Sequence, residues 1–285
     1  MNLFETFENL EPGFNPKTLI ESVCSKVLKE FEKIEILDKY GVYQLFKDYY
    51  NEVLQDDWFL LSFNGFLSAK ELRELTPLKD KNKKANYLEE PDFVIQKTHY
   101  KSDLIPKHLI KQRFFEQEAK ELEELENALN EKEADFEEFI EEHSNNEEGL
   151  FYELKINESV LKKELKNATD LEDKEILKTA LELLEAKNKA LKMKNKAHEE
   201  LELKAFHQYK NLKLDEIKDL IIQDKWLKSL KNALENKILK RINAFTSALN
   251  SIISNYSNSL LELDKEVKES ESKVLEHLKD LGLMG

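Results

Sequence analysis

Cysteine is nearly absent from this chain of 285 residues, and long apolar runs are missing. Cys24 is the single cysteine, so no internal disulfide can form. The chain contains no stretch of 18 apolar residues, which is about the length needed to cross a bilayer. The first twelve residues carry acidic and aromatic side chains, where a signal peptide needs a basic start and an apolar run. The sequence therefore predicts a cytoplasmic protein with no membrane span.

Glycine and proline are also scarce, with six glycines and five prolines in the whole chain. The glycines are widely spaced, so no glycine-rich loop that cradles a phosphate or a dinucleotide is present. They are Gly13, Gly41, Gly65, Gly149, Gly282 and Gly285. Binding of a nucleotide by such a loop is excluded.

The residue types of common catalytic centres do not occur in productive patterns. None of the six histidines lies in a zinc-protease motif, and one cysteine is too few for a Cys/His zinc site. His198, Glu199 and Glu202 share one helical surface, but such a group is more often found without a metal. Cys24 falls on the apolar face of a predicted helix, where a thiol is a poor nucleophile. We expect no catalytic, cofactor-binding or metal-binding residue in this chain.

Charge is abundant but unevenly distributed. The net charge is -14, and residues 116–148 hold 15 acidic and 2 basic side chains, so the rest of the chain is nearly neutral. This balance disfavours a free-standing nucleic-acid-binding protein. Five basic residues around Tyr100 form one weak exception, which suggests DNA-phosphate contacts inside a larger complex or simply a solvated loop and helix start. They are Lys97, Lys101, Lys107, Lys111 and Arg113.

The first 100 residues are predicted to form a small helical unit with a β-hairpin. Asn15 followed by Pro16 is typical of a helix start, and a second helix is expected after Asp38. The apolar run at 58–63, closed by Asn64-Gly65, favours a buried strand that pairs with a strand at 93–97. Between them, Ser68 and Glu71 suggest a capping box, and residues 79–84 a lysine-rich loop.

Residues 101–285 are predicted to form long antiparallel coiled-coil-like helices in a bundle, so the fold class is mainly α. Apolar residues at helical spacing indicate one helix at 106–143, a second at 171–209 and further helix at 215–280. Residues 144–149 are expected to reverse the chain. Asn188 and Asn195 fall in the apolar seam of the second pattern, either fixing register or facing solvent on a rotated helix.

Several segments together resemble the C-terminal region of the methylation (modification) subunit of type I restriction-modification enzymes. The most specific is Lys101–Pro106, and the resemblance extends from about Pro12 to the end of the chain. The strings that carry it are Gln55–Trp58, Lys101–Pro106, Arg113–Phe115, Glu147–Gly149, Asp224–Trp226 and Lys273–Leu278. Near Asn255-Tyr256 the chain lacks a proline that family members often have, so a helix is able to run on.

That family transfers a methyl group from S-adenosylmethionine to adenine N6 in DNA, with an Asn-Pro-Pro-Phe-type motif. Asn15-Pro16-Lys17 is the nearest string here and lacks the second proline and the aromatic residue. The resemblance therefore implies a non-catalytic part of the subunit. S-adenosylmethionine would be bound by a separate catalytic domain, and DNA would be contacted only indirectly.

The resemblance implies a docking function, because the C-terminal helices of that family pack on the DNA-specificity subunit. The alternative is a stand-alone structural coiled-coil protein that forms a homodimer. We expect the interface on the last two helices, although the same residues suit the core of a bundle equally well. These residues are Trp226, Leu230, Phe245, Leu249, Val274 and Leu278.

Overall fold

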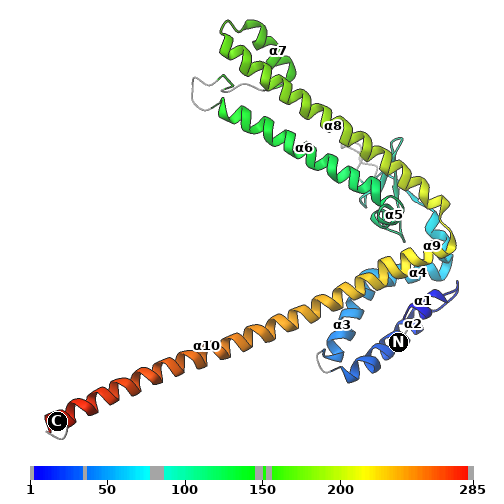
Figure 1. The fold of residues 1–285 in the computed structure, drawn as a ribbon. Helices are drawn as coiled ribbons and strands as arrows, with labels where there is room; N and C mark the ends of the chain where they lie inside the picture. Colours follow the sequence, from blue (N-terminus) through cyan, green and yellow to red (C-terminus); the bar gives the residue numbers. More distant parts are fainter. Residues whose placement is uncertain (1–2, 35–36, 78–86, 145–149, 152–155, 282–285) are drawn as a thin grey trace. The chain divides into compact units, whose positions relative to one another are not determined.

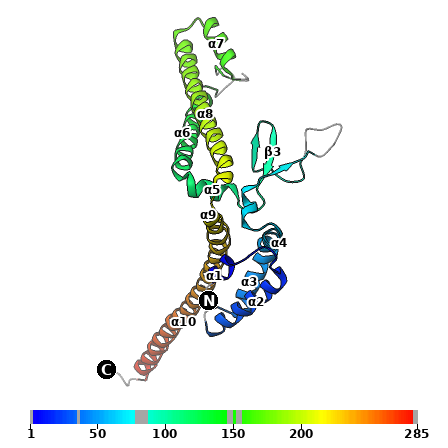
Figure 2. The same ribbon diagram turned by 90° about the vertical axis from the view of Figure 1, so that its right-hand side faces the viewer.

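The computed structural model describes residues 3–34, 37–77, 87–144, 150–151 and 156–281 (Figures 1 and 2). The expected lysine-rich loop, the string Glu147–Gly149 and most of the expected chain reversal lie outside these residues. The fold is mainly α with a small antiparallel sheet, as predicted. No described helix has both the length and the hydropathy needed to cross a membrane. The chain divides into two compact units. Each unit contains residues from before and after residue 100, where the sequence predicts the domain boundary.

The first unit contains residues 15–55 and 227–285. Its helix α2 (Pro16–Glu30) begins as predicted, with the Asn15 side chain accepting a hydrogen bond from the Lys17 amide at 3.0 Å. Helix α3 (Lys39–Tyr49) packs against α2 and is capped by Asp38. A 3-10 turn (Phe31–Lys33) follows α2, and a π-helical turn (Tyr50–Leu54) follows α3.

Buried side chains at helical spacing hold α2 and α3 together. They include Val23, Cys24 and Val27 on α2, with Val42 and Phe46 on α3. Burial raises the pKa of the Cys24 thiol, which agrees with the prediction that this cysteine is a core residue.

Helix α10 (Lys228–Asp280) is the longest element of the first unit, with 53 residues. At 1.5 Å per residue it extends for about 80 Å. It runs through Asn255-Tyr256 without a break, which the missing proline allowed. Within this unit α10 packs against α3 near its N-terminal end.

The second unit contains residues 4–14 and 56–226. Its aromatic core brings together Phe7 on α1 (Leu3–Glu8), Trp58 on α4 (Gln55–Asn64) and Trp226. All three side chains are fully buried, with ring centroids 5.5 to 6.4 Å apart. The prediction of a strand at 58–63 is therefore wrong, because this run belongs to α4. A short apolar run does not by itself distinguish a strand from a buried helix.

Three short strands form an antiparallel sheet in the order β1-β3-β2. They are β1 (Arg73–Leu75), β2 (Phe93–Ile95) and β3 (Thr98–Lys101). The expected strand at 93–97 exists in part, but it forms its hairpin with β3. Gln96 and Lys97 make the turn with positive φ angles of 49° and 70°, the combination that a type I′ hairpin turn requires.

The expected capping box at Ser68 and Glu71 is also wrong. A 3-10 helix (Phe66–Lys70) occupies this position, and the Ser68 hydroxyl donates to the Gly65 carbonyl at 2.7 Å. Glu71 ends that helix by donating its amide to the Ser68 carbonyl at 3.0 Å.

The single helix predicted at 106–143 is two helices, α5 (Lys107–Phe114) and α6 (Glu116–Glu142). Phe115 separates them with φ -135° and ψ 37°. α5 buries Leu109 and Ile110, whereas α6 buries the face that carries Leu129. At 100° per residue these faces differ by roughly 140°, so one straight helix cannot bury both.

Helix α8 (Leu171–Asn211) packs along α6 in an antiparallel pair, visible side by side in both views (Figures 1 and 2). The acidity of α6 is matched by lysines of α8. The interhelical ion pairs are Lys187–Glu133 at 3.2 Å, Lys194–Glu126 at 3.5 Å and Lys204–Glu118 at 3.0 Å. Asn188 is partly buried, whereas Asn195 is exposed to solvent. Between these two residues the predicted apolar seam therefore turns away from the neighbouring helix.

Helix α7 (Glu158–Asn167) covers the far end of this pair (Figure 1). Its Leu161 lies in a cluster with Phe151, Leu177 and Ala180. After α8 the chain continues through α9 (Leu214–Lys218) and a π-helical segment (Asp219–Leu227).

Gly65 occupies a backbone conformation that only glycine adopts easily, with φ 68° and ψ 178°. A Cβ at this position would lie 3.0 Å from Cγ of Pro12. We expect Gly65→Ala to lower the free energy of unfolding by about 1–3 kcal/mol. Gly13→Ala is the matched control, because Gly13 has φ 91° but no atom within 4 Å of the added Cβ. Equal losses in urea unfolding of the two variants would show that the Pro12 contact contributes nothing.

Candidate docking surface and buried polar junction

One face of α10 carries a continuous stripe of exposed apolar side chains, which we call the α10 stripe. At 100° per residue its members lie within about 140° of one another around the helix. Its exposed members are Leu239, Ile242, Phe245, Leu249, Ile252, Ile253, Tyr256, Leu260, Leu263, Val267, Val274 and Leu275. Contiguous apolar surface of this extent marks a site of interaction with another molecule.

The centre of α10 is unusual in composition. Residues 242–261 contain no charged side chain, although 36% of all residues in the chain are charged. Their polar members are only Asn, Ser, Thr and Tyr. Solvent-exposed helices usually carry charges, whereas the centres of interfaces are depleted in them. The segment therefore has the composition of a surface that becomes covered.

The α10 stripe faces away from the rest of its unit. Ala233, Asn236, Lys237 and Lys240 line a shallow depression together with residues of α3. These four positions lie roughly opposite the stripe at 100° per residue. Within the first unit, α3 thus packs beside residues 233–240 of α10, on the face opposite the stripe, and leaves the stripe open.

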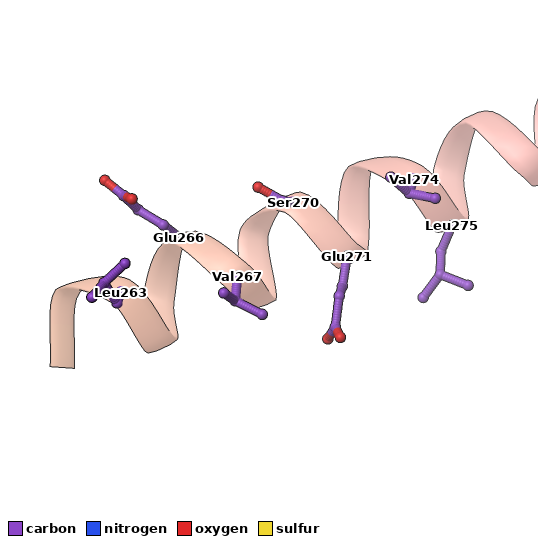
Figure 3. A pocket seen from close by; sticks show the side chains of 7 residues that line it. All are labelled: Leu263, Glu266, Val267, Ser270, Glu271, Val274 and Leu275. Atoms are coloured by element: carbon purple, nitrogen blue, oxygen red, sulfur yellow. The ribbon is translucent and has the colours of Figure 1, made fainter. Parts of the chain in front are cut away.

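A shallow apolar groove lies on the C-terminal part of the stripe, and Figure 3 shows that all the side chains that line it come from α10. Its apolar part comes from Leu263, Val267, Val274 and Leu275, and Glu266 and Glu271 lie beside them. Because the groove is formed by a single helix, it cannot enclose a small molecule. It is better suited to the side of a partner helix.

The six residues predicted for the interface have different surroundings. Phe245, Leu249 and Val274 are exposed by 69%, 45% and 57%. Leu230 and Leu278 are partly buried. Trp226 is fully buried inside the second unit, so for this residue the core alternative holds and the expected role in the interface does not.

The second unit contains a buried polar junction around Asp57, whose residue is only 3% exposed. The Lys225 ammonium lies 2.7 Å from Oδ2 of Asp57, and the Trp226 indole donates to the same oxygen at 2.7 Å. Lys225 also donates to the Leu104 carbonyl at 2.7 Å. These contacts join α4, the segment before α5 and the π-helical segment.

Desolvation raises the pKa of Asp57 above its ordinary value, and the charge of Lys225 and the hydrogen bonds from Lys225 and Trp226 partly oppose this. An acid whose pKa is raised by folding binds its proton more tightly in the folded state. Stability therefore falls as pH rises from the ordinary aspartate value of 3.8 through the raised pKa. The junction needs Lys225 to keep this loss small.

Removing that lysine should make the loss larger at neutral pH. In Lys225→Met the pKa of Asp57 rises further, because the neighbouring positive charge is gone. Each further pKa unit lowers the free energy of unfolding at neutral pH by about 1.4 kcal/mol relative to the parent chain. We expect the deficit to be larger at about pH 8 than at about pH 5, because Asp57 accepts a proton at the lower pH. Guanidinium unfolding at both pH values measures it. A deficit independent of pH would contradict this assignment.

Three of the strings that carry the family resemblance meet at this junction. Gln55–Trp58 supplies Asp57, Lys101–Pro106 supplies the Leu104 carbonyl, and Asp224–Trp226 supplies the cation and the indole. Polar groups from segments more than 100 residues apart in the sequence are thus joined by hydrogen bonds. This structural role accounts for the side chains of Asp57, Lys225 and Trp226, whereas Leu104 contributes only its backbone carbonyl.

Next to the junction, Ile105 is a shared acceptor. The hydroxyls of Ser102 and Tyr209 donate to its carbonyl at 2.6 and 2.7 Å. Burial raises the pKa of Tyr209, so this side chain stays a neutral donor.

Four of the five basic residues predicted to contact DNA phosphates have acidic partners within the chain. Lys101 lies 3.9 Å from Asp92, and Lys107 and Lys111 lie 3.4 and 2.5 Å from Glu202. Arg113 pairs with Asp219 and Asp224 at 2.8 and 2.9 Å. Lys97 is exposed in the β2–β3 turn. A phosphate would have to compete with these carboxylates, and the suggested DNA contact stays a prediction.

His198 lies 3.7 Å from Glu202, which the two lysines already engage. Among the residues that the structure describes, no group of three or more potential ligands is arranged to hold a metal ion.

Comparison with known proteins gives no relative: no family model, no curated protein and no solved structure matches this chain.

Proposed function

We propose that this chain is the C-terminal, non-catalytic part of the methylation subunit of a type I restriction-modification enzyme, an adenine-specific DNA methyltransferase of the cytoplasm. Its function is to dock that subunit onto the DNA-specificity subunit. S-adenosylmethionine is bound by a separate catalytic domain of the subunit, and this chain contacts DNA only indirectly.

The α10 stripe is the observation that carries this proposal. It presents exposed apolar side chains over residues 239–275, a length of roughly 50 Å, on a helix whose packing against α3 lies near its N-terminal end. An extended stripe of this kind fits the side of a partner helix. The junction adds support, since it gives three of the family-like strings a common structural role.

Co-purification with a type I specificity subunit tests the proposal. We expect the parent chain to bind that subunit and Phe245→Asp to abolish binding, because a carboxylate would be buried in the apolar contact. Ser247→Asp is the matched control, since it adds the same charge on the face turned away from the stripe. A specificity subunit that assembles normally without this chain would sink the proposal.

The alternative is a stand-alone structural coiled-coil protein that functions as a homodimer. It predicts a dimer that ignores the specificity subunit. Calorimetric titration with S-adenosylmethionine separates both hypotheses from an intrinsic methyltransferase, for which heat of binding to this chain would be required.

A further inference from the structure

The charge of α10 changes sign along its length. Residues 228–241 carry five basic side chains and one acidic one, a balance of +4. Residues 242–261 are uncharged, and residues 262–280 carry four basic and seven acidic side chains, a balance of -3. The helix thus has a basic section, a neutral centre and an acidic section.

This order makes α10 complementary to a reversed copy of itself. In an antiparallel pair the basic section of each copy lies beside the acidic section of the other, and the neutral centres meet. In a parallel pair, like sections would lie side by side and repel each other. A surface that is complementary to itself is what a two-fold symmetric interface requires.

The apolar positions nearest the centre of α10 have the same symmetry. Around a point between residues 250 and 251, Leu249 is balanced by Ile252 and Phe245 by Tyr256 at equal distances along the helix. All four side chains are exposed by 45% or more. An antiparallel pair centred there brings residues 239–262 of the two stripes together.

We propose that two copies of this chain associate through α10 as an antiparallel helix pair with its two-fold axis beside residues 249–252. At this register Lys231 lies near Glu271 of the second copy, and both residues lie on the face of the stripe. Lys231 is 73% exposed and lies 3.8 Å from Glu235 of its own helix, a solvated ion pair that leaves it able to reach the second copy.

This association goes beyond the proposed docking function and is compatible with it. The α10 stripe is about 140° wide, whereas the seam of a two-helix coiled coil is narrower. A second α10 covers part of that width and leaves a flank for a further helix. Helix α3 lies on the opposite face and does not obstruct the pair.

Sedimentation equilibrium of the full chain tests the pairing. We expect a dimer, and Leu249→Asp should weaken it by at least roughly 100-fold, because both copies then bury a carboxylate beside the two-fold axis. Ser251→Asp places the same charge on the opposite face and should leave the dimer intact. Both positions are exposed, so neither variant threatens the fold. A monomer at about 100 µM, or a dimer unaffected by Leu249→Asp, would overturn the proposal.

Disulfide trapping tests the orientation. When Lys231→Cys and Glu271→Cys chains are mixed under mild oxidation, we expect a disulfide between the two variants and little within either variant alone. The parent chain, whose Cys24 is buried, controls for background. Cross-linking of Lys231→Cys chains to one another would instead show a parallel pair and overturn the antiparallel arrangement.

The two proposals fail separately. A dimer that does not bind the specificity subunit leaves the pairing intact and removes the docking function. A chain that binds the specificity subunit but stays monomeric alone removes the pairing only.

Discussion

Asp57→Ala is expected to destabilise the second unit by about 3–5 kcal/mol, because removing one member of a buried ion pair leaves the other charge without compensation. Lys225 would lose its carboxylate partner with only 14% of its side chain exposed, and the Trp226 indole would lose its acceptor. The two tryptophans of the chain, Trp58 and Trp226, lie in this core, so tryptophan fluorescence during guanidinium unfolding reports on it directly.

Asp56→Ala is the matched control, since this neighbouring aspartate is exposed and should change stability by less than about 0.5 kcal/mol. The double variant Asp57→Asn, Lys225→Met should recover most of the loss, because it removes both charges and keeps an acceptor for the indole. If Asp57→Ala and Asp56→Ala cost the same, the junction does not stabilise the unit.

Trp226→Ala is expected to cost about 3–5 kcal/mol in the isolated chain, from the cavity left between Phe7 and Trp58 and the lost indole hydrogen bond. The loss should appear without any partner, with the fluorescence of Trp58 as the probe. This result would establish Trp226 as a core residue on energetic grounds.

Phe245→Ala provides the contrast, because Phe245 is 69% exposed on α10. Its effect on unfolding, measured by circular dichroism at low concentration, should stay within about 0.5 kcal/mol. A large loss for Phe245→Ala, or none for Trp226→Ala, would reverse the assignment of core and surface.

Local signals were sufficient to predict much of the helical architecture. Asn15 and Pro16 placed the start of α2 because side-chain capping depends only on neighbouring residues. The long apolar periodicity of 171–209 placed α8 within two residues at its C-terminal end. These features need no knowledge of what the segments pack against.

Other elements depend on tertiary contacts and were missed. The run at 58–63 is α4, because Trp58 and Leu61 face the core while Phe59 and Phe63 are exposed by 59% and 69%. The break between α5 and α6 at Phe115 involves neither glycine nor proline, so no residue type in the sequence indicates it. Both outcomes follow from which faces the neighbouring helices bury.

The candidate surfaces show the same division. The apolar spacing of Phe245, Leu249 and Val274 was visible in the sequence, but the exposure that makes them a surface was not. In the sequence, Asp57 and Lys225 belong only to separate strings, and Trp226 is in addition a predicted interface residue. Their contact spans 168 residues and became apparent only when the chain was folded.

The uncharged centre of α10 has a consequence for how partners are recognised. Ser, Asn, Thr and Ile are modest helix formers, so residues 242–261 gain little helical stability from their own sequence. Backbone amides there should exchange with deuterium rapidly in the free chain and slowly once the stripe is covered. Part of the binding free energy is then consumed in ordering this segment, which keeps association reversible and sensitive to the quality of the match.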